Sequence, residues 1–193
     1  MKTIAWDVDD VLNDQTHIWF KSYWRPAHPD CSLVYIQLSE NPPHRLLGIS
    51  QAEYLASLDR FRLAKAAYLN PVPEVLQWFQ QYGMQSRHIA LSAVPLSAAD
   101  ISAEWVIKYF GRWIRTFSFV PSTRDGETLP VYDIKKAEFL HWWGKADVLI
   151  DDSSAHVESA RRLGLHAVLM PRPWNNSSLT IAETLETLTH IAS

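Results

Sequence analysis

The sequence predicts an α/β fold, a parallel sheet of about five strands with a helical insertion between its first two strands. Three observations lead to this prediction. Short apolar runs recur along the chain, helical patterns of about ten or more residues separate the later runs, and the interval 14–86 separates the first two. Because a structureless loop of that length is improbable inside a domain, the long interval should contain helices of its own.

Five segments are predicted to be the strands of the sheet. Each is mainly apolar and too short to be a core helix. In chain order they are 3–8, 88–93, 116–120, 147–150 and 166–170.

The first helix of the insertion is expected over 13–24. It should end before Pro26, because the residue that precedes a proline avoids the helical conformation. The stretch 26–48 that follows has no regular pattern and is predicted to be irregular.

Two further helices are expected before the second strand. Ser50 and Glu53 form a capping box for one of them, which should stop at Asn70-Pro71. Pro73 at a first helical position and Gly83 after a last turn frame the other.

Four helices should follow the second strand, and each has a local start or stop signal. A side chain able to accept a hydrogen bond lies at the start of each helix, and a glycine ends the first three. The expected helices are 96–110 with Ser97 as the cap, 134–143 with Asp133 as the cap, 153–163, and a last helix that starts at the Thr180 and Glu183 capping box.

The composition favours a soluble protein with a small-molecule partner. The formal charge is −3 and no block of Lys or Arg is present, which argues against a nucleic acid polymer as the partner. Cys31 is the only cysteine, so no internal disulfide can form, and no Cys/His cluster has zinc-site spacing. No signal-peptide pattern or membrane-length apolar stretch occurs, so we expect a cytoplasmic protein without a membrane partner.

Carboxylates are concentrated where predicted strands end. Asp7, Asp9 and Asp10 follow the first strand, and Asp151-Asp152 follows the fourth. Ligands of an open parallel sheet bind beyond the carboxyl ends of its strands, so these groups should lie near one another. Like charges at such spacing raise one another's proton affinity, and this cost predicts a cation or a chemical task that compensates for it.

Two more candidate side chains should reach the same edge. Ser92 lies near the end of the second predicted strand, and Lys135 and Lys136 open the helix that leads to the fourth. Only one of two adjacent helical residues can point squarely at one site, and we favour Lys136.

A calcium loop and a solvated acidic turn both account less well for the first carboxylates. Asp7-Val8-Asp9 begins like an EF-hand calcium loop, but that loop needs Gly at its sixth position and Glu at its twelfth, where Leu12 and Ile18 stand. A solvated acidic turn is also disfavoured, because turns rarely interleave Asp with Val and Leu so tightly.

The order of these motifs resembles the haloacid dehalogenase-like (HAD) hydrolase superfamily. The matching segments are Asp7-Val8-Asp9-Asp10-Val11-Leu12, Ser92, a Lys at a helix start and Val148-Leu149-Ile150-Asp151-Asp152. The resemblance implies a Rossmann-like HAD core over 1–13 and 87–193 and a helical cap over 14–86. Pro173-Trp174-Asn175 and the Ile-Asp-Asp ending are similar to the C-type 5′-nucleotidase (5′(3′)-deoxyribonucleotidase) branch.

The resemblance also implies roles for the site residues. Asp7 would be the nucleophile that forms an aspartyl-phosphate, and Asp9 would be the general acid and base. Mg²⁺ would be bound by Asp7, the backbone carbonyl of Asp9, and Asp151, with Asp152 as a helper. The Ser92 hydroxyl and the lysine would stabilise the charge on the phosphoryl group.

The expected activity is Mg²⁺-dependent hydrolysis of a small phosphorylated metabolite, with a nucleoside monophosphate as one candidate. A dehalogenase would not be expected to carry an acid at Asp9, and a mutase differs from a phosphatase mainly in its insertion. A catalytically silent binding or regulatory protein with the same fold stays open as the alternative, because fold and function can separate.

Overall fold

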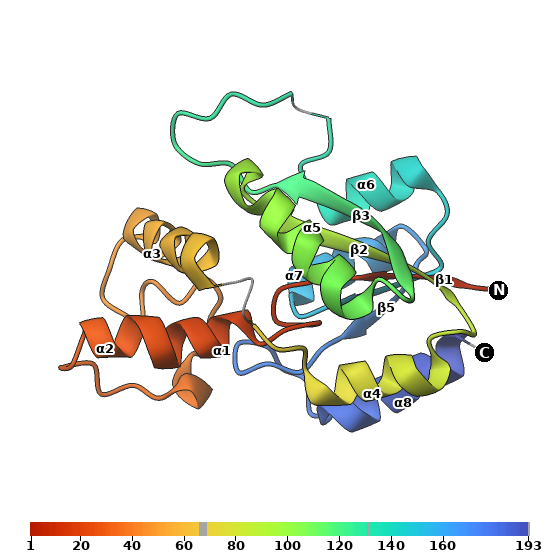
Figure 1. Cartoon of the computed structure of the whole chain (residues 1–193), viewed down its shortest axis with the longest axis horizontal. Helices are drawn as coiled ribbons and strands as arrows, with labels where there is room; N and C mark the ends of the chain where they lie inside the picture. The colour runs from red at the N-terminus through yellow and green to blue at the C-terminus, as the bar shows by residue number, and fades with distance from the viewer. Residues whose placement is uncertain (66–68, 131, 193) are drawn as a thin grey trace.

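The computed structural model describes residues 1–65, 69–130 and 132–192. At its centre is a five-stranded parallel sheet in the order β3-β2-β1-β4-β5 (Figure 1). All five predicted segments form strands, so the predicted α/β fold class is confirmed. The strands are β1 (Thr3–Trp6), β2 (Arg87–Val94), β3 (Ile114–Pro121), β4 (Val148–Asp151) and β5 (His166–Leu169).

Helices cover both faces of the sheet, as connections between parallel strands require. One face is covered by α4 (Pro73–Tyr82), α5 (Leu96–Phe110) and α8 (Ile181–Ala192), and the other by α6 (Lys136–Trp143) and α7 (Ser154–Arg162). Successive side chains of a strand point to opposite faces, so Ile4 and Trp6 lie in one hydrophobic core and Ala5 lies in the other.

The chain between β1 and β2 is largely helical, as predicted. Two pieces of it, around α1 and around α3, extend away from the sheet on the left of Figure 1. The elements in this interval before α4 are α1 (Gln15–Trp19), the π-helical turn η1 (Phe20–Trp24), α2 (Arg25–Ala27), the short 3₁₀ turn η2 (Tyr35–Gln37) and α3 (Gln51–Lys65).

The predicted end of the first helix before Pro26 is wrong. The chain stays helical to Ala27, because the turn before the proline is π-helical and the Arg25 N–H donates to the Phe20 carbonyl, five residues back. This wider turn removes the clash that a proline ring makes with the carbonyl four residues back in an α-helix. The predicted continuation of α3 to Asn70-Pro71 falls partly on residues 66–68, outside the described residues.

Two of the predicted N-terminal caps are confirmed and two are wrong. Ser50 with Glu53 and Thr180 with Glu183 make the expected side-chain contacts. The structure adds a cap at α7, where the Ser153 side chain accepts the His156 N–H. Ser97 does not cap α5, which starts one residue earlier after Pro95, and Asp133 does not cap α6, which starts at Lys136 after the extended residue Lys135. Tertiary placement of the loop that enters each helix decided these two starts over the local propensity.

The division into a core of 1–13 and 87–193 and a cap of 14–86 stays a prediction. Within the latter interval, α4 lies on the sheet beside α8, where the Trp78 indole N–H donates to the Thr189 hydroxyl at 2.8 Å (Figure 1). Among the described residues, no helix has the length and apolar character needed to cross a membrane.

Candidate active site

Three carboxylates meet at the carboxyl ends of the two central strands. Asp7 follows β1 directly, and Asp151 ends the neighbouring strand β4, whose pairing with β1 aligns Trp6 with Ile150. Oxygen atoms of Asp7, Asp151 and Asp152 all lie within 4.8 Å of one another, and all three residues are buried. The parallel register therefore brings together two motifs that lie far apart in the sequence.

The ammonium group of Lys136 lies between two of these carboxylates. Its Nζ is 2.6 Å from Asp7 Oδ1 and 2.8 Å from Asp151 Oδ2, and the side chain is 1% exposed. Burial alone would lower the pKa of Lys136, but the two carboxylates outweigh burial and raise this pKa above its ordinary value. Lys135 is exposed and precedes the helix, so of the two lysines only Lys136 faces the carboxylates.

The cluster has more negative charge than one lysine balances. Burial, reinforced by the nearby carboxylates, raises the pKa of Asp7 well above its ordinary value in spite of Lys136, and burial with Asp151 raises the pKa of Asp152 to about 7. Burial acts against ionisation of Asp151 as well, yet Lys136 lowers the pKa of this carboxyl to about 2. A divalent cation among the three oxygens would supply the missing positive charge, so this donor set fits Mg²⁺.

The nucleophile proposed from the sequence has one oxygen engaged and one open. Oδ1 of Asp7 accepts hydrogen bonds from the Val8 N–H at 2.7 Å and from Lys136. Among the described residues, nothing donates a hydrogen bond to Oδ2. These contacts fix the rotation of the carboxylate and leave one oxygen for a ligand.

Ser92 supplies an unpaired hydroxyl. The residue lies inside β2, which runs to Val94, and its side chain is fully buried. Its Oγ has no hydrogen-bond partner among the described residues, although the residue lines the cavity into which the site opens. Buried hydroxyls are nearly always paired, so this orphan fits a group that a ligand would satisfy.

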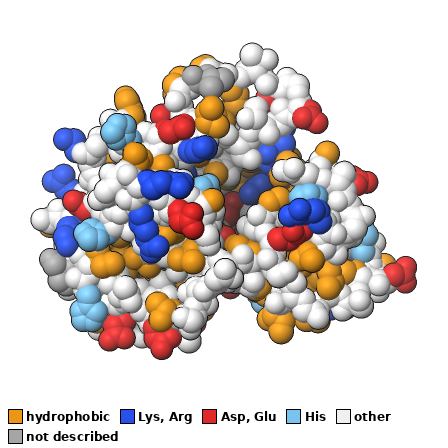
Figure 2. Space-filling model, turned by 180° about the vertical axis from the view of Figure 1, so that it is seen from behind, with side chains coloured by type: hydrophobic (Ala, Val, Ile, Leu, Met, Phe, Trp, Pro, Cys, Tyr) orange, Lys and Arg blue, Asp and Glu red, His pale blue; other side chains and the backbone are white. Residues whose placement is uncertain are grey.

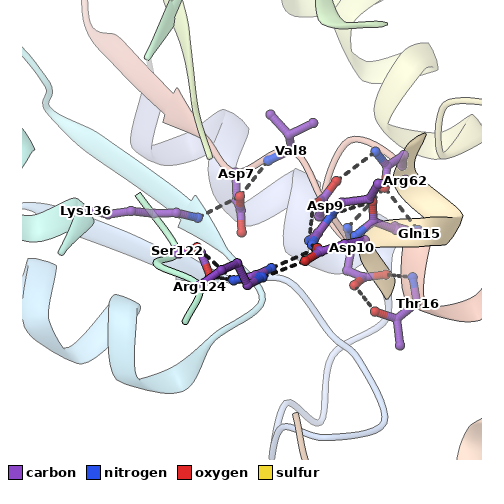
Figure 3. Close-up of polar contacts among 12 residues, drawn as sticks. Asp7, Val8, Asp9, Asp10, Gln15, Thr16, Arg62, Ser122, Arg124 and Lys136 are labelled. Atoms are coloured by element: carbon purple, nitrogen blue, oxygen red, sulfur yellow. Dashed lines mark hydrogen bonds and ion pairs between the residues drawn. The ribbon is translucent and has the colours of Figure 1, made fainter. Parts of the chain in front are cut away.

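The Asp9 side chain lies outside the three-carboxylate cluster. Its Oδ2 forms an ion pair with Arg62 Nη2 at 3.0 Å, and its Oδ1 is 3.4 Å from Asn13 Nδ2 (Figure 3). Arg62 belongs to α3 of the insertion, and sequence reasoning missed it. No local signal connects a helical arginine to a motif 53 positions earlier.

Arg62 is one member of a chain of partly buried ion pairs. Asp59 accepts a hydrogen bond from Arg62 Nη1 at 3.1 Å and two from Arg124, at 2.6 Å from Nε and 2.8 Å from Nη2. Arg124 follows β3, so these contacts join the insertion to the sheet edge. Burial opposes the charge on Arg62, but Asp9 and Asp59 outweigh it and hold the pKa of Arg62 above its ordinary value.

Asp10 has a structural role at the start of the insertion. Its φ is 61°, a left-handed conformation that Asp tolerates better than most residues, and its Oδ1 accepts the N–H of Thr16 at 2.9 Å in the first turn of α1. Arg172 Nε donates to the Asp10 carbonyl at 2.7 Å. The residue thus turns the chain from the site into the insertion.

The loop after β5 and the first turn of α7 form hydrogen bonds with Asp151-Asp152. The Trp174 indole N–H donates to Asp152 Oδ2 at 2.7 Å, and Asn175 Nδ2 donates to the Asp152 carbonyl at 2.8 Å. His156, in the first turn of α7, places Nδ1 at 3.1 Å from Asp151 Oδ1. These contacts fix the orientation of Asp151 and of Asp152.

The site opens into a cavity of about 590 Å³. Its floor contains Asp7, Asp152 and Lys136, and α3 contributes the apolar wall through Tyr54 and Leu58. Figure 2 shows a hollow between two parts of the molecule with acidic and basic side chains at its walls. The volume is enough for a small phosphorylated metabolite.

Comparisons with known proteins identify the fold. No family model matches the chain, and no curated protein matches its sequence. Among solved structures, a haloacid dehalogenase-like family hydrolase from Streptococcus pneumoniae superposes with a TM-score of 0.65 at 12% identity over 98% of both chains. A candidate β-phosphoglucomutase from Thermotoga maritima gives 0.59 at 16% identity, over 98% of this chain and 99% of that one.

A third structural neighbour has a similar score. A candidate phosphoglycolate phosphatase from Lactobacillus delbrueckii has a TM-score of 0.61 at 14% identity, and the match covers 99% of this chain and 98% of that one. The chain therefore has the Rossmann-like α/β fold of these HAD-like hydrolases.

Proposed function

We propose that this protein is a Mg²⁺-dependent phosphatase that hydrolyses a small phosphomonoester through an aspartyl-phosphate on Asp7. The observation that carries the proposal is the buried group of Asp7, Asp151 and Asp152, with Lys136 between Asp7 and Asp151 and with Asp7, Asp152 and Lys136 at the floor of the cavity. The phosphatase and hydrolase descriptions of its structural neighbours agree with this proposal.

Asp7, Asp151, Asp152 and the backbone carbonyl of Asp9 would hold the Mg²⁺. Bound there, the ion would neutralise charge on the nucleophile and on the phosphoryl group, which otherwise repel each other. Three hard oxygen ligands from carboxylates suit Mg²⁺, which keeps several waters.

In the first step, the open oxygen of Asp7 attacks phosphorus and the bond from phosphorus to the ester oxygen breaks. Lys136 and the unpaired hydroxyl of Ser92 donate hydrogen bonds to the phosphoryl oxygens. Asp9 gives its proton to the departing ester oxygen, so the product leaves as a neutral alcohol.

In the second step, Asp9 as a carboxylate takes a proton from water, and the water oxygen attacks the phosphorus of the aspartyl-phosphate. The bond between phosphorus and the Asp7 oxygen breaks, which releases inorganic phosphate and restores both carboxyl groups to their starting states. One residue therefore serves as the acid in the first step and as the base in the second.

For the substrate we propose a nucleoside monophosphate, which would make the enzyme a 5′-nucleotidase. The aromatic side chains of Tyr54 and Trp174 line the cavity and could hold a base by stacking. Rates on a panel of nucleoside monophosphates and sugar phosphates test this. Equal slow rates on all of them would exclude a nucleotidase.

The Asp7→Asn variant tests the activity itself. We expect turnover of p-nitrophenyl phosphate to fall below detection, because an amide is a poor nucleophile, while circular dichroism stays unchanged. Full activity of the variant would remove Asp7 as the nucleophile. Mg²⁺-dependent ligand binding by a wild-type protein that hydrolyses no phosphomonoester would favour the alternative of a non-catalytic binding protein.

A further inference from the structure

We propose that Arg62 is a positioning residue that holds the carboxyl group of Asp9 in the orientation needed for proton transfer. The inference rests on the proposed phosphatase function, since Asp9 is the acid and base of that reaction. It assigns to the insertion a part in the chemistry in addition to covering the cavity.

The contact between the two side chains is direct and poorly solvated. Arg62 Nη2 lies 3.0 Å from Asp9 Oδ2, and the two side chains are 8% and 16% exposed (Figure 3). A hydrogen bond from a guanidinium to a carboxyl oxygen is strong in such surroundings, and Oδ2 can accept it whether or not Oδ1 carries a proton. The other oxygen, Oδ1, has one contact among the described residues, the long 3.4 Å approach of Asn13 Nδ2. Arg62 therefore fixes Oδ2 and leaves Oδ1 for exchange of a proton with the substrate.

The guanidinium group is itself held on its other sides. Arg62 Nη1 donates to Asp59 Oδ1 at 3.1 Å and Nε donates to Gln15 Oε1 at 3.3 Å. Arg124 donates hydrogen bonds to both oxygens of the same Asp59 carboxylate. A planar group with three directed contacts cannot swing, and a lysine could not reproduce this geometry.

Orientation matters here because a general acid must approach the oxygen that it protonates to hydrogen-bond distance. Asp9 stands on a short loop between β1 and α1, and a free carboxyl group there would sample several rotamers. Since Arg62 belongs to α3, the carboxyl group of Asp9 is held only when the insertion lies against the core.

The test compares two esters with different leaving groups. p-Nitrophenolate leaves as a stable anion and needs no proton, whereas the alkoxide of glycerol 2-phosphate needs one from Asp9. For Arg62→Met we expect kcat/KM to fall about tenfold or more on glycerol 2-phosphate and less than about threefold on p-nitrophenyl phosphate. The reason is that the leaving group of glycerol 2-phosphate needs the proton of Asp9 and p-nitrophenolate does not. The ratio of the two values in one preparation does not depend on how much of the protein is folded.

Two controls separate positioning from general damage. Arg60→Met removes an exposed arginine of the same helix and should leave the ratio unchanged. Arg62→Lys keeps a positive charge near Asp9 but loses the planar guanidinium with its directed donors, so its ratio should lie between those of wild type and Arg62→Met.

A double variant decides whether Arg62 acts through Asp9. In the Asp9→Asn background, Arg62→Met should cause no further change in the ratio, because the residue that it positions is already gone. Fold-effects that multiply, or an unchanged ratio in the single variant, would overturn the positioning role while leaving the phosphatase intact. A wild-type protein that hydrolyses neither ester would overturn the proposed function and this role with it.

Discussion

Replacement of His88 by glutamine should reduce the acid sensitivity of the fold. His88 is buried near the start of β2, where the Trp6 indole N–H donates to its Nδ1 at 3.0 Å and its Nε2 lies 2.9 Å from the Gly83 carbonyl. Nδ1 must accept and Nε2 must donate, so the packed ring is the neutral tautomer with its proton on Nε2. Burial lowers the pKa of His88 from 6.5 to about 4, and the bond to Gly83 offsets this only in part.

The sign and size of the effect follow from these two pKa values. Between about pH 4 and 6.5 the unfolded chain binds a proton at this histidine and the folded chain does not, so the free energy of unfolding falls as the pH is lowered through this window. A gap of about 2.5 pH units at about 1.4 kcal/mol each gives a total loss of about 3.5 kcal/mol, of which about 2 kcal/mol falls between pH 7 and pH 4.5. The stability that comes from the neutral His88 ring is fully present above pH 6.5 and is lost below pH 4.

Urea unfolding followed by tryptophan fluorescence at pH 7 and pH 4.5 measures this. The raised pKa values of Asp10 and Asp152 change the stability of wild type in the opposite direction over the same range, so the useful quantity is the difference between wild type and variant at each pH. We expect the free energy of unfolding of wild type, relative to that of His88→Gln, to be about 2 kcal/mol lower at pH 4.5 than at pH 7. His141→Gln, at an exposed position of α6, is the matched control and should show no such shift. An equal difference at the two pH values would refute the assignment of a neutral buried ring.

Two further predictions concern the site. Ser92→Ala removes a buried hydroxyl that has no partner among the described residues, so we expect the free energy of unfolding to rise by about 1 kcal/mol while KM for phosphomonoesters increases; a loss of stability in urea unfolding would show that the hydroxyl is already satisfied. Mg²⁺ at about a hundred times its Kd should stabilise wild type by about 2.7 kcal/mol, and thermal unfolding of Asp151→Asn should respond far less; equal shifts in the two proteins would place the ion elsewhere.

The fold was predictable because its signals are local. Apolar runs of strand length, separated by helices with recognisable ends, leave few arrangements other than a parallel sheet with helices on both faces. The capping box of Ser50 and Glu53 formed as expected, because its contacts span three residues and need no tertiary partner. Ser97 and Asp133 had the right residue types, but packing of the entering loops started those helices elsewhere.

The candidate site was predictable in part, for a related reason. Carboxylates at the ends of parallel strands must share one edge of the sheet, and strand assignment therefore placed Asp7, Asp9, Asp10 and Asp151-Asp152 at that edge. The structure brings only Asp7, Asp151 and Asp152 together, because the Asp9 side chain pairs with Arg62 and the Asp10 side chain accepts from Thr16. The choice between Lys135 and Lys136 depended on where the helix begins, and the structure turned Lys136 inward.

The sequence by itself determined which segments are strands and helices and which chemical groups stand at the ends of the strands. Only the tertiary structure decided that Arg62 of the insertion meets Asp9, that Arg124 meets Asp59, and that the Ser92 hydroxyl lies unpaired in the cavity, among the residues that the structure describes. Secondary structure depends on residues a few positions apart, whereas an ion pair between separate elements depends on how whole faces pack, and that information is spread over the entire chain.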